Sequence, residues 1–234
     1  IANVIAQQGL INQPELQRYL THIALVVAEN SHRYETPVQV YNLDNSSITG
    51  YASPNGAIFV SKGMLQLMKN EAEFAFFAAH ELSHIVHNHG IKETNKRETK
   101  IEAQQAFENL EDQVGKRDKK YKMAEAELTK WANQMYEYTI QDRLKEYEFE
   151  ADHWAIVYTY RAGYNPTAGL NLLQWIYSER GDFEQRIGQA KWKGASLQKR
   201  ILKIRDQLNE LNIRQGFGQS YEQTFHNYLE KLKE

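Results

Sequence analysis

The sequence predicts an α+β fold that is predominantly helical, with a small β-sheet of about three strands. Three observations support this prediction. Segments with strand patterning precede residue 61, apolar residues recur at helical spacing through much of the remaining chain, and an apolar run leads directly into His80. The chain of 234 residues is long enough for one sizeable core. We therefore expect a single domain over residues 1–234, with a charged helical insertion at about residues 92–138.

The first part of the chain contains the predicted strands. Residues 13–30 precede them and are expected to form a helix, because Pro14 suits a first helical turn and apolar side chains follow at three- and four-residue spacing. Residues 37–41 alternate as a half-buried strand does. A second extended segment, residues 57–60, follows a turn at residues 53–56. On sequence alone this second strand is either internal or an edge strand.

Helices are predicted for most of the remaining sequence. Ser61 opens a short helix through Met68, and Asn70 with Glu73 has the spacing of an N-terminal cap for the next helix. The insertion at residues 92–138 is dense in mixed charge, which is typical of a solvated amphipathic arm and less often of a partner-binding arm. Further helices are expected at residues 144–160, 165–175, 197–211 and after 218, the first of them ended by Gly163.

Composition excludes several classes of function. The net charge of −2 gives no electrostatic case for binding nucleic acid. The absence of cysteine excludes disulfides and thiolate metal sites, and it leaves His, Asp and Glu as the strong metal ligands. No run reaches the roughly 20 apolar residues that span a bilayer, so we expect no transmembrane segment. Because the sequence begins with Ile1 rather than Met, membrane association through a removed N-terminal signal or anchor stays open.

The segment from His80 to His84 has the pattern of a metal centre. On a helix these two histidines lie one turn apart on the same face, so both imidazoles can reach one zinc ion at about 2.0–2.1 Å. Glu81 follows the first histidine and can reach a zinc-bound water as a general base. The segment thus supplies two ligands and a base, but it lacks a third protein ligand.

Carboxylates further along the chain are the best candidates for the missing ligand. None of the six other histidines has a metal motif around it. Glu148 and Asp152 are four residues apart and share one helical face, so one can bind zinc while the other accepts the spare N–H of a ligand histidine. By itself this pair is a weak signal, because a charged helix contains many such pairs by chance.

Several segments together resemble the HtpX and CAAX-prenyl-protease family of zinc metallopeptidases, which are gluzincins. They are residues 55–65, residues 79–84 with a histidine at 89, residues 148–152 and residues 163–166, and the similarity covers most of residues 14–180 outside the charged insertion. The resemblance implies one zinc ion per chain, bound by His80, His84 and Glu148. It also implies that Glu81 is the catalytic base and that Asp152 supports a ligand histidine.

The same resemblance implies the activity and the location. It implies a zinc-dependent endopeptidase that cleaves unfolded or misassembled proteins, with zinc activating the water and Glu81 taking its proton. The chain is more similar to bacterial extracytoplasmic members than to multi-span membrane members, which implies a periplasmic or envelope-associated protein. It departs from the family where a His-Pro pair is usual, because residues 194–196 read Gly-Ala-Ser before Arg200.

Substrate contacts and a rival function are further expectations. An extended peptide could add to the strand near Asn55, Gly56, Ala57 and Ile58. The group that stabilises the oxyanion stays open among Lys145, His153 and several tyrosines. The alternative function is a zinc-stabilised chaperone or partner-binding protein with slow or gated proteolysis, in which the charged insertion covers the cleft.

Overall fold

The computed structural model describes residues 8–92, 144–180, 196–213 and 216–233. The charged insertion predicted at residues 92–138 therefore lies, beyond its first residue, outside the described residues. The labelled elements are α2 (Pro14–Glu29), β1 (Gln39–Leu43), β2 (Gly50–Ala52), β3 (Ala57–Ser61), α3 (Lys62–Leu67), α4 (Glu71–Val86), α7 (Ala168–Arg180), α9 (Leu197–Glu210), α10 (Glu222–Leu229) and the 3₁₀-helix η1 (Glu230–Lys233). Residues 144–161 form a further helix, called helix 144–161 below.

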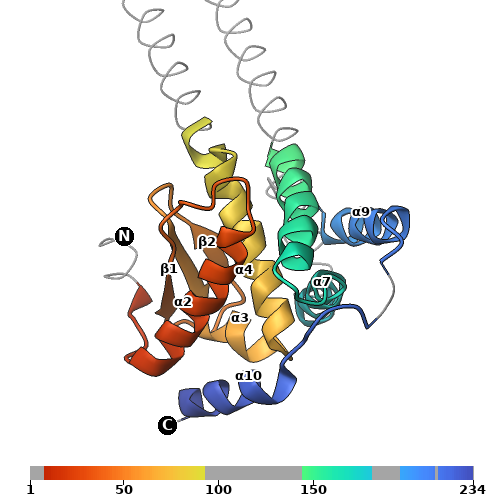
Figure 1. Cartoon of the computed structure of the whole chain (residues 1–234). Helices are drawn as coiled ribbons and strands as arrows, with labels where there is room; N and C mark the ends of the chain where they lie inside the picture. Colours follow the sequence, from red (N-terminus) through yellow and green to blue (C-terminus); the bar gives the residue numbers. More distant parts are fainter. Residues whose placement is uncertain (1–7, 93–143, 181–195, 214–215, 234) are drawn as a thin grey trace, which may run out of the picture.

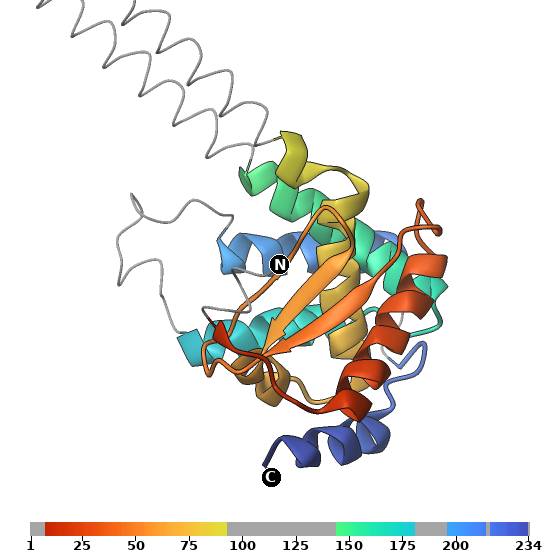
Figure 2. The ribbon, with the colours of Figure 1, turned by 90° about the vertical axis from the view of Figure 1, so that its left-hand side faces the viewer.

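These elements confirm the predicted fold, which is predominantly helical with one small three-stranded sheet. The sheet has the order β1-β3-β2. Figure 2 shows β1 and β3 side by side and running in the same direction. β1 runs parallel to β3, with Gln39 opposite Ala57, and β2 runs antiparallel to β3, with Gly50 opposite Val60. Every residue of β3 is buried. A strand buried on both faces requires a continuous apolar run rather than an alternating one, which is the pattern found at residues 57–60.

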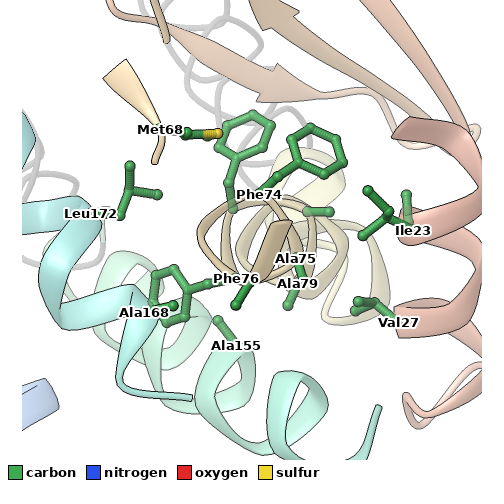
Figure 3. Close-up of a cluster of buried hydrophobic side chains, with 14 of the residues drawn as sticks. Ile23, Val27, Met68, Phe74, Ala75, Phe76, Ala79, Ala155, Ala168 and Leu172 are labelled. Carbon is green, nitrogen blue, oxygen red and sulfur yellow. The ribbon is translucent and has the colours of Figure 1, made fainter. Parts of the chain in front are cut away.

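Helix α4 occupies the centre of the fold (Figure 1). All of its residues except His84 are buried, because apolar side chains are present on every side of the helix. Figure 3 shows α4 with Ile23 and Val27 of α2 on one side and with Ala155 of helix 144–161 and Leu172 of α7 on the other. β2 and β3 also contact α4. The helix that carries the His80–His84 segment is therefore packed against both the sheet and the helical layer.

Two glycines allow neighbouring elements to approach α4 closely. A Cβ atom on Gly50 of β2 would lie 2.3 Å from the ring of Phe77, and one on Gly169 of α7 would lie 2.2 Å from the ring of Phe76. Both distances are shorter than van der Waals contact allows. Glycine at these two positions therefore sets how near the edge strand and α7 lie to the central helix.

The predicted C-terminal cap of helix 144–161 is confirmed. Gly163 has φ +83°, its N–H donates to the Tyr160 carbonyl at 3.0 Å, and the Tyr164 N–H donates to the Thr159 carbonyl at 3.1 Å. These two bonds form a Schellman motif. The cap directs the Tyr164 hydroxyl to Glu71 in the first turn of α4, where it donates a hydrogen bond of 2.7 Å. The end of one helix is thereby connected to the start of another.

Within the part of the chain that the structure describes, no helix combines the length and the apolar character that a membrane span requires.

We predict that Gly163→Ala lowers the free energy of unfolding by about 1–2 kcal/mol, because a left-handed backbone brings Cβ close to the following carbonyl oxygen. No other group lies within 4 Å of a Cβ built at this position, so the loss comes from the backbone alone. Urea denaturation measures it. Gly163→Asn is the matched control and should lose less, because asparagine tolerates this conformation better. Equal stability of Gly163→Ala and the parent protein would contradict the prediction.

Candidate metal centre

Three side chains from two helices converge where α4 faces helix 144–161. The Nε2 atoms of His80 and His84 lie 3.2 Å apart. Glu148 places Oε2 3.6 Å from the first of these atoms and Oε1 3.6 Å from the second. This is the one group of three or more potential ligands that the described residues bring within 4.8 Å of one another. The convergence joins residues that are more than sixty positions apart in the sequence.

The spacing of these atoms fits a single zinc ion. Tetrahedral coordination with bonds of about 2.0–2.1 Å separates ligand atoms by about 3.3 Å. The two Nε2 atoms are 3.2 Å apart, and each lies 3.6 Å from its nearer Glu148 oxygen, so the three side chains are spaced close to that value. Two imidazoles and one carboxylate are also a donor set that suits zinc and leaves a fourth position open. The residues present therefore fit the metal that the sequence resemblance implies.

Asp152 and Arg200 lie behind His80. The Asp152 Oδ1 atom is 2.9 Å from His80 Nδ1, the ring atom opposite the one that faces Glu148. Arg200 of α9 donates to both Asp152 oxygens at 2.7 Å and contacts Glu148 Oε2 at 2.8 Å. Such a carboxylate–histidine pair fixes the orientation and tautomer of a ligand ring. One arginine thus connects a candidate ligand with the residue that supports another.

The pKa values of this group follow from burial and from neighbouring charges. Burial would raise the pKa of Asp152, but attraction to Arg200 and hydrogen bonds from His80 and Arg200 outweigh it and lower the pKa to about 2. Burial, His80 and His89 lower the pKa of His84 well below its usual value. His84 is therefore neutral near pH 7, as a metal ligand must be.

Glu81 has the environment of a proton acceptor that works near neutral pH. Its side chain is buried beside the candidate ligands, and it lines the same cleft as His80 and His84. Burial raises its pKa to about 7, and the nearby Glu148 carboxylate adds to this effect, whereas His80 and Arg200 partly oppose it. A carboxyl group with such a pKa can both accept and return a proton at neutral pH.

The candidate ligands open into a cleft of about 400 Å³. One wall is the edge strand β2 with the residues just before it, including Thr49 and Tyr51. The opposite wall consists of apolar side chains of α7, namely Leu172, Leu173 and Ile176. Glu81, Glu148 and Arg200 supply polar groups to the same cleft. A pocket with apolar walls and a few convergent polar groups is the usual form of a site for a small molecule or a peptide side chain.

The prediction of strand addition at residues 55–58 is wrong. β3 is the central strand and pairs with both β1 and β2, so its backbone groups are already hydrogen-bonded on both sides. Ala57 and Ile58 are buried in this strand, whereas Asn55 and Gly56 lie in the preceding turn. None of the four lines the cleft. In the described part of the sheet, the edge beside the candidate metal centre belongs to β2.

The sequence alone indicated no role for Arg200. Two of the residues considered as the oxyanion stabiliser lie away from the cleft. Lys145 and His153 are absent from the described residues that line the cleft, and His153 is exposed. Arg200 lies on the same face of α9 as the buried Ile204, four residues later. An arginine on the apolar face of a helix needs a buried counter-ion, and this was the available signal. α9 packs through the buried Ile201, Ile204 and Leu208, and its Lys203 Nζ lies 3.7 Å from the centre of the Phe149 ring.

Comparison with known proteins agrees with this geometry. The sequence model of peptidase family M48 matches residues 12–224. The Beta-barrel assembly-enhancing protease of Escherichia coli K12 is 26% identical over 80 residues, which are 34% of this chain and 16% of that protein. The protein of the same name from Yersinia pestis is 29% identical over 84 residues, which are 36% of this chain and 17% of that protein. The match thus spans about a sixth of the length of these relatives.

We predict that Arg200→Met lowers the free energy of unfolding by about 3–5 kcal/mol, because it leaves the buried Asp152 carboxylate without its counter-ion. Urea denaturation at pH 7 measures the loss. The matched control is Arg205→Met on the exposed face of the same helix, for which we expect a change within about 0.5 kcal/mol.

Adding Asp152→Asn to Arg200→Met should recover part of the lost stability, since no buried aspartate charge then remains without a partner. Equal stability of Arg200→Met and Arg205→Met would contradict the assignment of Arg200 as the counter-ion.

Proposed function

The chain belongs to peptidase family M48, and from this premise we propose that it is a zinc-dependent endopeptidase acting on unfolded or misassembled proteins. The observation that carries the proposal is the convergence of His80, His84 and Glu148 beside the buried Glu81 carboxyl group. We assign one zinc ion per chain to this group. When bound, zinc lowers the pKa of a coordinated water toward neutrality and polarises the carbonyl group of the substrate.

Glu81 is the proposed general base. It takes a proton from the attacking water and gives it to the leaving amine. Its burial and its pKa of about 7 support this role, because the group can accept a proton in the first step and donate it in the second. Asp152 and Arg200 contact neither the water nor the peptide in this proposal. They hold His80 and Glu148 in place.

The edge of β2 is the proposed binding site for the peptide backbone. Gly50, Tyr51 and Ala52 line the cleft and pair with β3 on one side, so their other side faces the position of an added strand. Backbone pairing of this kind selects an extended chain rather than a particular sequence. The apolar wall from Leu172 to Ile176 favours an apolar side chain of the substrate. An extended segment with exposed apolar side chains is what an unfolded protein offers.

The relatives suggest where this activity is used. Proteins with the matching segment are named for enhancing β-barrel assembly. β-Barrel proteins of this kind belong to outer membranes. We therefore assign the chain to an extracytoplasmic, envelope-associated location and assign misassembled envelope proteins as its substrates.

The central test is Glu81→Gln. We expect this variant to bind zinc as the parent protein does and to cleave casein at least about 100-fold more slowly, because glutamine cannot take a proton from water. Zinc content by mass spectrometry and casein cleavage are measured on the same samples. Glu210→Gln, at an exposed position of α9, is the matched control and should retain full activity. Full turnover by Glu81→Gln would exclude Glu81 as the base, whereas zinc binding without cleavage by the parent protein would favour a zinc-stabilised chaperone or binding protein.

Metal removal gives a second test. A chelator should abolish casein cleavage and lower the melting temperature, and added zinc should restore both. At a free zinc concentration about 1,000 times the dissociation constant, binding stabilises the folded state by about 4 kcal/mol. In the control His84→Ala the chelator should shift the melting temperature far less, because one ligand is missing. Cleavage that is unchanged by the chelator would overturn the proposal.

A further inference from the structure

His84 has a second contact in addition to those of the candidate metal centre. Its Nδ1 atom lies 3.0 Å from Nδ1 of His89, and the other ring nitrogen of His89 lies 3.2 Å from Glu150 Oε2. His89 is only 3% exposed. A buried imidazole that bridges a candidate ligand and a carboxylate has no part in the proposed proton transfer, so its position calls for another explanation.

The position of each ring proton along the contacts from His84 through His89 to Glu150 is determined by which nitrogen of His84 faces the candidate metal centre. Its Nε2 atom points to His80 and Glu148, so binding through Nε2 leaves the ring proton on Nδ1. The His84 Nδ1–H group then donates to Nδ1 of His89. His89 must carry its own proton on Nε2, and it donates that proton to Glu150. Each donor thereby meets one acceptor.

We propose that His89 and Glu150 are positioning residues that fix the ring orientation and tautomer of His84 for zinc binding. This inference rests on the proposed function, since it assumes zinc at His80, His84 and Glu148. The contacts parallel those at the other histidine ligand, where Asp152 accepts from His80 Nδ1. Both histidines are then oriented from helix 144–161, one through Asp152 directly and the other through His89.

The backbone places His89 for this role. Helix α4 ends at Val86, and Asn88 adopts a left-handed conformation with φ +55°, which asparagine tolerates better than most residues do. The helical path is interrupted at residues 87 and 88 and resumes at His89, whose ring lies beside that of His84. The ring of Tyr147 stacks on His89 with the ring centres 4.3 Å apart and the planes inclined by 14°. Tyr147 and Glu150 lie three residues apart on one face of helix 144–161. Tyr147 contacts the flat side of the His89 ring, and Glu150 contacts its Nε2 atom.

His87 provides a natural comparison. Its Nδ1 atom lies 3.3 Å from the other oxygen of Glu150, and its ring stacks on Trp154. The His87 ring contacts Glu150, His89 and Trp154, whereas the His89 ring contacts the candidate ligand His84 directly. Replacing either histidine by phenylalanine keeps an aromatic ring and removes a contact to Glu150. Only the change at residue 89 removes the acceptor for His84.

The test is zinc affinity, measured by competition with a chromophoric chelator. His89→Phe should weaken zinc binding by about 10- to 100-fold, the usual effect of losing a partner of a ligand histidine. His87→Phe should change it by less than about threefold. His89→Gln should recover part of the affinity, since its side-chain carbonyl can accept from His84. The visible spectrum of the cobalt-loaded protein should change in His89→Phe and not in His87→Phe.

Glu150→Leu keeps the test decisive if His89→Phe fails to fold. The Glu150 side chain is 41% exposed, so its replacement leaves the core undisturbed, and we expect zinc binding about tenfold weaker. If His89→Phe folds, parent-like zinc affinity with an unchanged cobalt spectrum would overturn the inference and leave the proposed function intact. If His89→Phe does not fold, parent-like zinc affinity of Glu150→Leu would do the same. Failure of the parent protein to bind zinc would overturn both.

Discussion

The fold depends on one constraint, which is that α4 is buried at every residue except His84 and still carries the polar groups of His80 and Glu81. An apolar helix of this kind must be covered on every side, and α2, the sheet, helix 144–161 and α7 together provide the cover. Polar groups in such a place are costly unless each finds a partner. The elements that bury α4 also supply partners to His80, His84 and Glu71, so that the same contacts serve both packing and the candidate metal centre.

Helix 144–161 provides most of these partners. Glu148 faces the two histidines, Asp152 supports His80, and the inferred chain through Glu150 supports His84. Arg200 of α9 balances the charge of two of these carboxylates. Ligands held by such second contacts are oriented before a metal binds, which reduces the entropy lost on binding. The remaining open side of the group is the cleft between β2 and α7, where a substrate can approach.

The residues that match peptidase family M48 include the elements that cover α4 and form the candidate metal centre. The match to peptidase family M48 covers residues 12–224, and the described elements of that range form the cover of α4, the candidate ligands and the cleft. The similarity to the β-barrel assembly-enhancing proteases covers about a third of the chain. In the proposed function, the choice of substrate depends on the β2 edge and on the wall formed by α7.

The sequence by itself determined what local patterns encode. Helical spacing gave α2 and α9, the Asn70 and Gly163 caps gave two helix ends, and the four-residue spacing of His80 and His84 put two imidazoles on one face. Glu148 and Asp152 also followed from spacing, with the resemblance assigning a role to each. The tertiary structure decided which strand lies at the edge, because a continuous apolar run fits a central strand and an edge strand equally well until its neighbours are known. It also decided the positions of Arg200 and His89, since contacts across 120 residues or across a left-handed turn leave no periodic signal in the chain.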